Sequence, residues 1–156
     1  MAENEPYKLA LSKMMSLCSS REYCRSDIMA KLEDKQLKDG EIAKIITQLE
    51  KDRFIDEERY AKAFASDKFR YNDWGKIKIA AQLKVKHING KHIMTALGGI
   101  GEKEYLEKIK KLLADKRKSV KAKNQYDLYG KLLRYGQSKG FESELLYRFI
   151  NSPDEE

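Results

Sequence analysis

The chain has 156 residues, of which 41% are hydrophobic and 37% are charged, and its formal net charge is +7 at pH 7. This length can bury a core as one domain or as several small repeats. The apolar runs are shorter than the ~20 residues that span a bilayer, and the N-terminus lacks the basic and apolar regions of a signal peptide. We therefore expect a cytoplasmic protein with no membrane partner, in which Cys18 and Cys24 form no disulfide framework.

Positive charge is concentrated in the middle and C-terminal parts of the chain. Residues 1–56 carry 10 basic and 11 acidic residues, a net charge of −1, whereas residues 57–101 carry +5 and residues 102–156 carry +3. This asymmetry indicates an anionic partner for the second and third parts of the chain.

The hydrophobic pattern predicts an all-α protein, because apolar residues recur at the i, i+3, i+4, i+7 spacing of helices that bury one face. No segment alternates as a strand would. The expected helices span 8–20, 26–36, 40–52, 57–71, 75–86, 90–98, 102–120, 125–138 and 142–151. Residues 1–7 and 152–156 are expected to form disordered tails.

Several helix ends are marked by capping residues. Asp56 is suited to cap the helix that follows it, and Glu57 and Glu58 complement the positive end of the helix dipole. Asp39 and Asn89 are plausible N-caps for later helices. The glycine-rich stretch 98–101 lacks the preceding strand and the Lys-Ser/Thr pair of a phosphate-binding loop, so we interpret it as a break between repeats.

The apolar pattern repeats along the chain. A shift of 51 residues places Ile28 on Ile79 and Leu32 on Leu83, and a further shift of 53 reaches Leu132. A three-helix unit that leaves part of its apolar surface uncovered can bury it by stacking on a neighbour. We therefore predict three helical repeats, at 8–55, 56–101 and 102–151, stacked into an elongated, curved body.

Several stretches resemble the RecX family of bacterial regulatory proteins. They are Ser20 to Tyr23, Leu49 to Phe64, Gly75 to Leu83 and Lys139-Gly140-Phe141, in an order that covers about Leu9 to Ile150. The resemblance implies three tandem three-helix repeats. It also implies a non-enzymatic modulator of the RecA recombinase that acts in homologous recombination, DNA repair and the SOS response.

The sequence departs from the family pattern at three places. The usual Ser-x-x-Glu capping box before the second helix becomes Cys24 and Asp27, with Ser26 as an alternative cap. The Lys-Gly turns of the first two repeats become Lys-Gln and Lys-His. Gly136 takes an apolar helix position, and a glycine inside a helix costs about 1 kcal/mol relative to alanine. The third repeat is therefore expected to be less stable or shorter than its pattern suggests.

Catalytic and metal-binding arrangements are poorly supported. Cys18 and Cys24 lie far from His87 and His92 in the chain and do not have the spacing of a zinc site. No serine lies in a nucleophile elbow, and neither histidine has an obvious carboxylate partner. We expect no enzyme, no metal and no cofactor.

The basic segments are the candidate binding site. Residues 68–91 carry seven basic residues against one acid. The basic run at 110–123 has two interpretations of equal weight, a solvated helix face and a phosphate-binding surface. The expected nucleic-acid contacts are Lys68, Arg70, Lys76, Lys78, Lys84, Lys86, Lys91, Lys116, Arg117 and Lys118. Tyr71 and Trp74 are candidates for base stacking, with a role in the core weighed equally for both.

The resemblance and the charge together predict a monomer that lies in the groove of a RecA–DNA filament. It would contact single- and double-stranded DNA without sequence specificity. Two alternatives stay open. The chain could be a helical DNA-binding module that acts without RecA, or a helical adaptor for an acidic protein.

Overall fold

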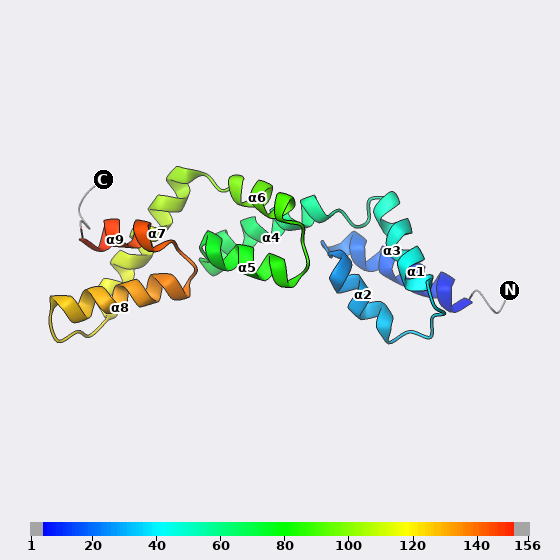
Figure 1. The fold of residues 1–156 in the computed structure, drawn as a ribbon, viewed down its shortest axis with the longest axis horizontal. Helices are drawn as coiled ribbons and strands as arrows, with labels where there is room; N and C mark the ends of the chain where they lie inside the picture. The colour runs from blue at the N-terminus through cyan, green and yellow to red at the C-terminus, as the bar shows by residue number, and fades with distance from the viewer. Residues whose placement is uncertain (1–4, 152–156) are drawn as a thin grey trace.

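The computed structural model describes residues 5–151, which fold into helices joined by turns and contain no strand (Figure 1). The first three helices are α1 (Glu5–Ser20), α2 (Arg25–Glu33) and α3 (Glu41–Lys51). They are followed by α4 (Glu57–Asn72), α5 (Lys76–Val85) and α6 (Gly90–Gly98). The last three are α7 (Glu102–Ser119), α8 (Gln125–Ser138) and α9 (Ser143–Asn151). The predicted all-α class is confirmed.

The helix bounds differ from the expected ones by at most three residues. The largest differences are at α1, which begins at Glu5 rather than at residue 8, and at α2, which ends at Glu33 rather than at 36. Pro6 does not interrupt α1, because the first turn of a helix has no use for the missing N–H group. The expected disordered tail at residues 1–7 is wrong for residues 5–7, which belong to α1. Residues 1–4 and 152–156 of the expected tails lie outside the described residues.

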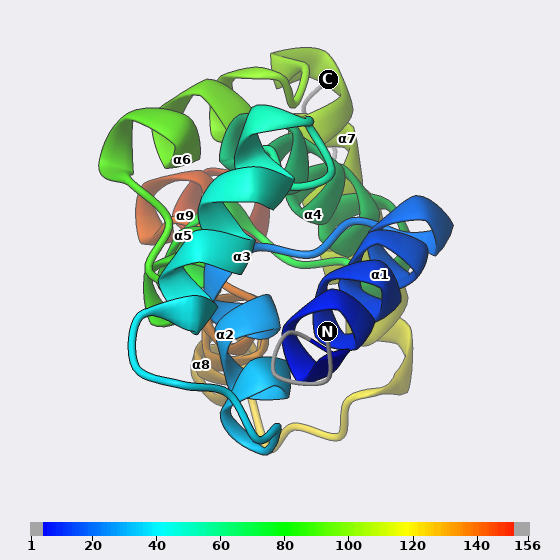
Figure 2. The same cartoon turned by 90° about the vertical axis from the view of Figure 1, so that its right-hand side faces the viewer.

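The helices form three consecutive groups arranged along one long axis, with the two ends of the chain at opposite ends of the body (Figure 1). Viewed from the N-terminal end, the three groups lie one behind another (Figure 2). We call these groups unit 1 (α1–α3), unit 2 (α4–α6) and unit 3 (α7–α9). The expected elongated helical-repeat architecture is confirmed, whereas the residue boundaries proposed for the repeats stay a prediction.

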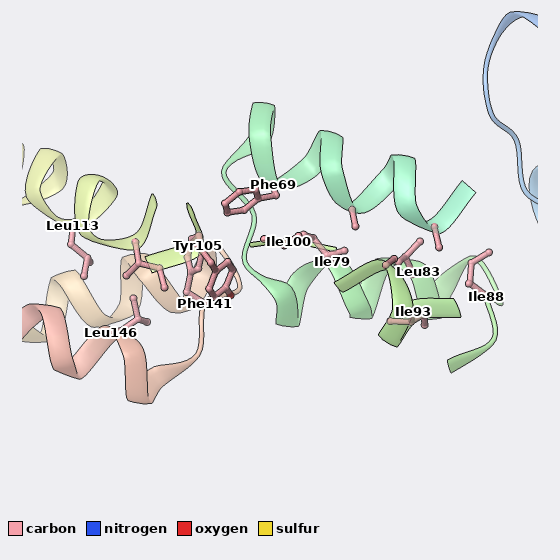
Figure 3. Packing of buried hydrophobic residues seen from close by; sticks show 14 of the residues in the cluster. Phe69, Ile79, Leu83, Ile88, Ile93, Ile100, Tyr105, Leu113, Phe141 and Leu146 are labelled. Atoms are coloured by element: carbon pink, nitrogen blue, oxygen red, sulfur yellow. The ribbon is translucent and has the colours of Figure 1, made fainter. Parts of the chain in front are cut away.

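The buried side chains divide into two clusters. One is confined to unit 1 and the residues that follow it, and it includes Met14, Ile28, Ile45 and Leu49. The other runs continuously through units 2 and 3, from Tyr60 to Ile150 (Figure 3). Cys24 is the single residue from unit 1 in this larger cluster. Units 2 and 3 therefore share one core, and unit 1 has its own.

The helix caps agree with the sequence at two of three places. Asp56 accepts a hydrogen bond from Arg59 N at 3.0 Å, and Asn89 accepts one from Lys91 N at 2.8 Å. The prediction of Asp39 as a cap is wrong, because Gly40 occupies that position with φ at 83°. The chain enters α3 through a left-handed residue, a conformation that glycine adopts without strain.

Cys24 is the N-cap of α2, and its N–H donates to Asp27 Oδ2 at 3.3 Å, so the substituted capping box is retained. Ser26, the alternative cap, is used differently: its hydroxyl donates to Lys86 O in unit 2 at 2.9 Å. The predicted break is also confirmed, since α6 ends at Gly98 and α7 begins after Gly101.

Gly136 does not shorten the third unit, because α8 continues through it to Ser138. A Cβ atom at Gly136 would lie 2.3 Å from Leu146 Cδ2. The glycine therefore allows α8 and α9 to approach closely, and the expectation of a shortened helix was wrong.

Candidate nucleic-acid interface

Two lysine side chains lie close to the ring of Trp74, at the turn between α4 and α5. Lys68 Nζ lies 5.0 Å and Lys78 Nζ lies 4.7 Å from the centre of its ring. Phe64 packs against the same ring in an edge-on arrangement, with the ring centres 6.2 Å apart. The turn is made by Asp73, which ends α4 in the left-handed conformation. Cations near a tryptophan ring are held by its quadrupole without being neutralised.

Gly75, the residue after Trp74, contacts the backbone of unit 3. Gly75 N donates to Lys139 O at 2.7 Å, and Ile77 N donates to Gly140 O at 3.0 Å. A Cβ atom at Gly75 would lie 2.3 Å from Gly140 O, so this backbone contact requires glycine. Gly140 itself has φ at 92°, in the left-handed region that glycine adopts without strain.

Lys139 extends the cluster into unit 3. Its Nζ lies 6.0 Å from the centre of the Tyr135 ring, and Lys116 Nζ on α7 lies 5.0 Å from the same centre. Burial raises the pKa of the Tyr135 hydroxyl, and the carboxylates of Asp73 and Asp115 add to the increase, so this ring stays neutral. We call Lys68, Lys78, Lys139 and Lys116, with the rings of Trp74 and Tyr135, the lysine band.

Three predicted residues, Lys68, Lys78 and Lys116, belong to the lysine band, and Trp74 lies at its centre. Lys139 was missed. Its position before the Gly140 turn was visible in the sequence, but its proximity to Gly75 arises only from the packing of unit 3 on unit 2. Trp74 is half-buried and packs on Phe64, whereas Tyr71 is 79% exposed. Base stacking by either ring stays a prediction.

The other predicted cations are distributed over several places. Lys76 Nζ lies 4.8 Å from the Tyr105 ring centre, and Arg117 donates to Ile150 O at 3.1 Å. Arg70 lines a hollow of about 400 Å³ beside the Lys108–Asp73 ion pair, which joins units 2 and 3 at 2.7 Å. Three more are exposed on separate helices: Lys84, Lys91 and Lys118.

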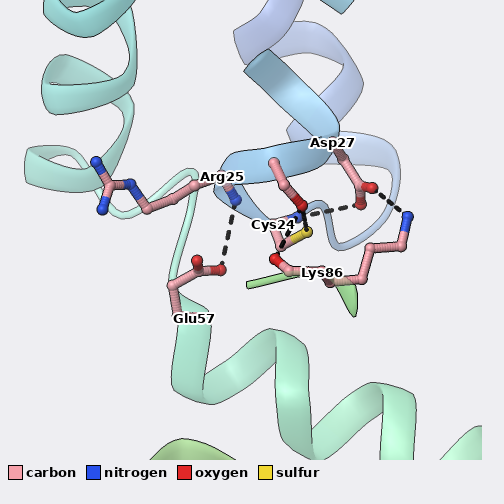
Figure 4. Close-up of polar contacts among 6 residues, drawn as sticks. Cys24, Arg25, Asp27, Glu57 and Lys86 are labelled. Carbon is pink, nitrogen blue, oxygen red and sulfur yellow. Dashed lines mark hydrogen bonds and ion pairs between the residues drawn. The ribbon is translucent and has the colours of Figure 1, made fainter. Parts of the chain in front are cut away.

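Lys86 has a different environment from the one expected of a free phosphate contact. Its Nζ forms an ion pair of 2.6 Å with Asp27 Oδ1 of unit 1 (Figure 4). Burial by itself would raise the pKa of Asp27, but the hydrogen bonds from Lys86 and Cys24 outweigh it, and the pKa lies below its ordinary value. The hydrogen bond to Asp27 raises the pKa of Lys86. Lys86 therefore joins unit 2 to unit 1.

Neither a metal cluster nor a membrane span is found in the described part of the chain. Residues 5–151 contain no group of three or more His, Cys, Asp or Glu side chains that could hold a metal ion. No helix among them combines the length and the apolar character needed to cross a bilayer.

The amino-acid sequence is similar to those of known proteins. Residues 56–97, which contain α4, α5 and most of α6, match the model of the second three-helix domain of RecX. The regulatory protein RecX of Oceanobacillus iheyensis is 25% identical over 79% of this chain and 45% of its own length. That of Clostridium acetobutylicum is 28% identical over 89% of this chain and 66% of its own length.

A solved structure gives the same fold. RecX from Lactobacillus salivarius superposes with a TM-score of 0.83 at 20% identity, covering 99% of each chain. By contrast, this chain spans about half the length of the first curated relatives that it matches, 45% and 59% of them.

Helical units in tandem, joined at a lysine-rich junction, define the chain as a modular all-α protein of the helical-repeat class. The particular proteins that the chain is similar to are the RecX regulatory proteins. Residues 56–97 match the second RecX domain, and the two relatives above are 25% and 28% identical to the chain.

Proposed function

We propose that the chain inhibits the RecA recombinase by lying in the groove of a RecA–DNA filament. Similarity to the RecX regulatory proteins supports the class of partner, and the elongated body supports the mode of binding (Figure 1). The observation that carries the proposal is the lysine band. Two of its lysines lie beside the Trp74 ring in unit 2 and two beside the Tyr135 ring in unit 3, and the backbone contact of Gly75 with Lys139 joins the two units.

In this proposal the lysine band faces the DNA phosphates. Each phosphate that a lysine neutralises releases condensed counterions, so affinity comes mainly from charge and does not depend on base sequence. A body that occupies the filament groove excludes homologous DNA from it. Recombination, ATP turnover and the co-protease activity of the filament would all fall. The protein would act in the cytoplasm as a monomer.

The test compares charge-reversal variants on RecA filaments. Lys78→Glu and Lys139→Glu should weaken filament binding and relieve inhibition of strand exchange, and each lost phosphate contact should lower the slope of log K against log salt by about one. Lys44→Glu, at an exposed position on α3 of unit 1, is the matched control and should change neither quantity.

Two outcomes would reject the proposal. If the unaltered protein changes neither strand exchange nor ATP turnover, RecA is not its target. If Lys44→Glu weakens binding as much as Lys78→Glu does, net charge rather than the lysine band determines the affinity. Binding to one duplex about a thousandfold more tightly than to random DNA would instead indicate a sequence-specific module.

A further inference from the structure

The third unit contains a second hollow, separate from the lysine band, on the surface where α8 and α9 lie side by side. It has a volume of about 510 Å³, and three tyrosines line it: Tyr126, Tyr129 and Tyr147. Tyr126 is 90% exposed and Tyr147 is 50% exposed. Lys123 and Arg134 also line it. We call this hollow the tyrosine groove.

The rings of the tyrosine groove differ from those of the lysine band in what covers them. Trp74 and Tyr135 are half-buried and each has two lysines close to its ring. Tyr126 and Tyr147 leave half or more of their surface open to solvent. An aromatic ring that is exposed beside cationic side chains can stack on a nucleobase, whereas a ring already packed in the fold must first lose its neighbours.

The walls of the groove are held in place by contacts behind them. Arg117 donates to Ile150 O at 3.1 Å and lies 5.8 Å from the Tyr129 ring centre. Asn124 caps α8 by accepting from Asp127 N at 2.8 Å. Gly130 has no side chain, and Arg134 lies close over it, with a guanidinium nitrogen 3.3 Å from where a Cβ atom would be. The contacts of Arg117 hold α7, α8 and α9 together around the groove.

The electrostatics of the groove favour an anion. Its one acidic residue, Asp127, accepts a hydrogen bond from Lys123 N at 3.0 Å and an ion pair from Lys131 at 3.2 Å. The hydrogen bond from Lys123, with the contact from Lys131, lowers the pKa of Asp127. Arg134 also lowers the pKa of this carboxylate through its charge. The three cations Lys123, Lys131 and Arg134 outnumber the one carboxylate, so the groove keeps a net positive charge.

We propose that the tyrosine groove binds single-stranded nucleic acid, with bases stacked on Tyr126 and Tyr147 and the adjoining phosphates held by Lys123 and Arg134. The groove should bind a single strand rather than a duplex, because the bases of a single strand expose their faces. In a duplex the bases are stacked on one another and present only their edges in the grooves. This site uses none of the residues of the lysine band and requires no RecA.

The experiment measures binding of the free protein to a fluorescein-labelled oligothymidylate of about 15 nucleotides, a length within the range that one single-strand site covers. The double variant Tyr126→Ala/Tyr147→Ala should bind at least about tenfold more weakly, because each stacked base contributes about 1–3 kcal/mol. Tyr126→Phe/Tyr147→Phe keeps the rings and should bind as the unaltered protein does. Met94→Ala, at another exposed position, on α6, is the control.

An abasic strand of equal length separates stacking from charge. It should bind the unaltered protein and the alanine variant equally, whereas Lys123→Ala/Arg134→Ala should weaken its binding. Equal loss on both strands would overturn the assignment, because it would mean that the tyrosines act on the backbone or on folding. Thermal unfolding followed by circular dichroism checks the fold of each variant.

The result also distinguishes this site from the proposed function. If the alanine variant binds oligothymidylate normally but still inhibits strand exchange through the lysine band, the tyrosine groove is not a nucleic-acid site and the RecA proposal stands. If binding to oligothymidylate is lost while filament inhibition is unaffected, the groove is assigned and acts independently of the filament.

Discussion

Single glycines decide how closely the helices of unit 3 approach. Gly136 is buried in α8, where a Cβ atom would lie 2.3 Å from Leu146 Cδ2 and 2.7 Å from Leu146 Cδ1. Leu146 is itself 1% exposed, so the crowded atoms belong to a packed core rather than to a movable surface side chain. Gly136 thus lowers the intrinsic stability of α8 but allows α8 and α9 to pack closely.

The first prediction concerns this position. Gly136→Ala should lower the free energy of unfolding by about 1–3 kcal/mol, since overpacking a core outweighs the gain of up to about 1 kcal/mol in helix propensity. Gly98→Ala is the control, because nothing lies within 4 Å of its Cβ position. It should be neutral or stabilising. Urea unfolding of both variants checks this, and a Gly136→Ala protein more stable than Gly98→Ala would contradict the packing argument.

The two junctions between units are built from different chemistry. Units 2 and 3 meet through backbone hydrogen bonds at Gly75 and Gly140, a shared apolar core and the Lys108–Asp73 ion pair. The Tyr105 hydroxyl accepts from Lys76 N at 2.9 Å and contacts Glu142. Units 1 and 2 meet mainly through side chains: the Lys86–Asp27 pair, the Ser26 hydroxyl, and an Arg59–Glu22 pair of 2.6 Å. Ion pairs therefore make a larger share of the junction between units 1 and 2 than of the junction between units 2 and 3.

This difference predicts a pH dependence at Asp27. Because the folded-state pKa of Asp27 is lowered, the pair stabilises the protein above the ordinary aspartate pKa of about 3.9, and this contribution is lost as the pH falls through the lowered pKa. Asp27→Asn should therefore lower the free energy of unfolding at pH 7 by about 1 kcal/mol. The difference from the unaltered protein should close below about pH 4.

Asp39→Asn serves as the control, since Asp39 is exposed in the loop before α3. Urea unfolding from pH 7 down to pH 3 is the measurement. A difference between Asp27→Asn and the unaltered protein that is constant over this range would mean that the carboxylate charge does not act at the junction.

At the scale of the whole molecule, stability follows the division into two cores. Unit 1 has its own cluster of nine buried residues, whereas units 2 and 3 share nineteen, one of them Cys24 from unit 1. Repeat proteins unfold as a unit where their interfaces are strong and separately where these are weak. The backbone and apolar junction should couple units 2 and 3, and the polar junction should couple unit 1 less tightly.

Hydrogen exchange at increasing urea concentrations should therefore show two steps. Amides of α1–α3 should lose protection together at one concentration, and those of α4–α9 should lose it together at another. Added salt should weaken the Lys86–Asp27 and Arg59–Glu22 pairs and move the two steps further apart, because partly exposed ion pairs are screened. Loss of protection at one common urea concentration throughout residues 5–151 would contradict separate cores.

Much of the local structure could be read from the sequence. The i, i+3, i+4, i+7 spacing, the Asp56 and Asn89 caps and the 98–101 break each depend on residues within a few positions of one another, so they were predicted to within three residues. The prediction of Asp39 as an N-cap was wrong because Gly40, in the left-handed conformation, is the N-cap of α3.

The sites depended on contacts between residues far apart in the chain. Nothing near Lys86 indicated its pairing with Asp27, and nothing near Lys139 indicated that its carbonyl meets Gly75. The sequence by itself determined the helices and the uneven distribution of positive charge, because both are local properties. Only the tertiary structure decided which lysines join across a junction, which one holds two units together and which tyrosines remain exposed, because helix packing places these side chains.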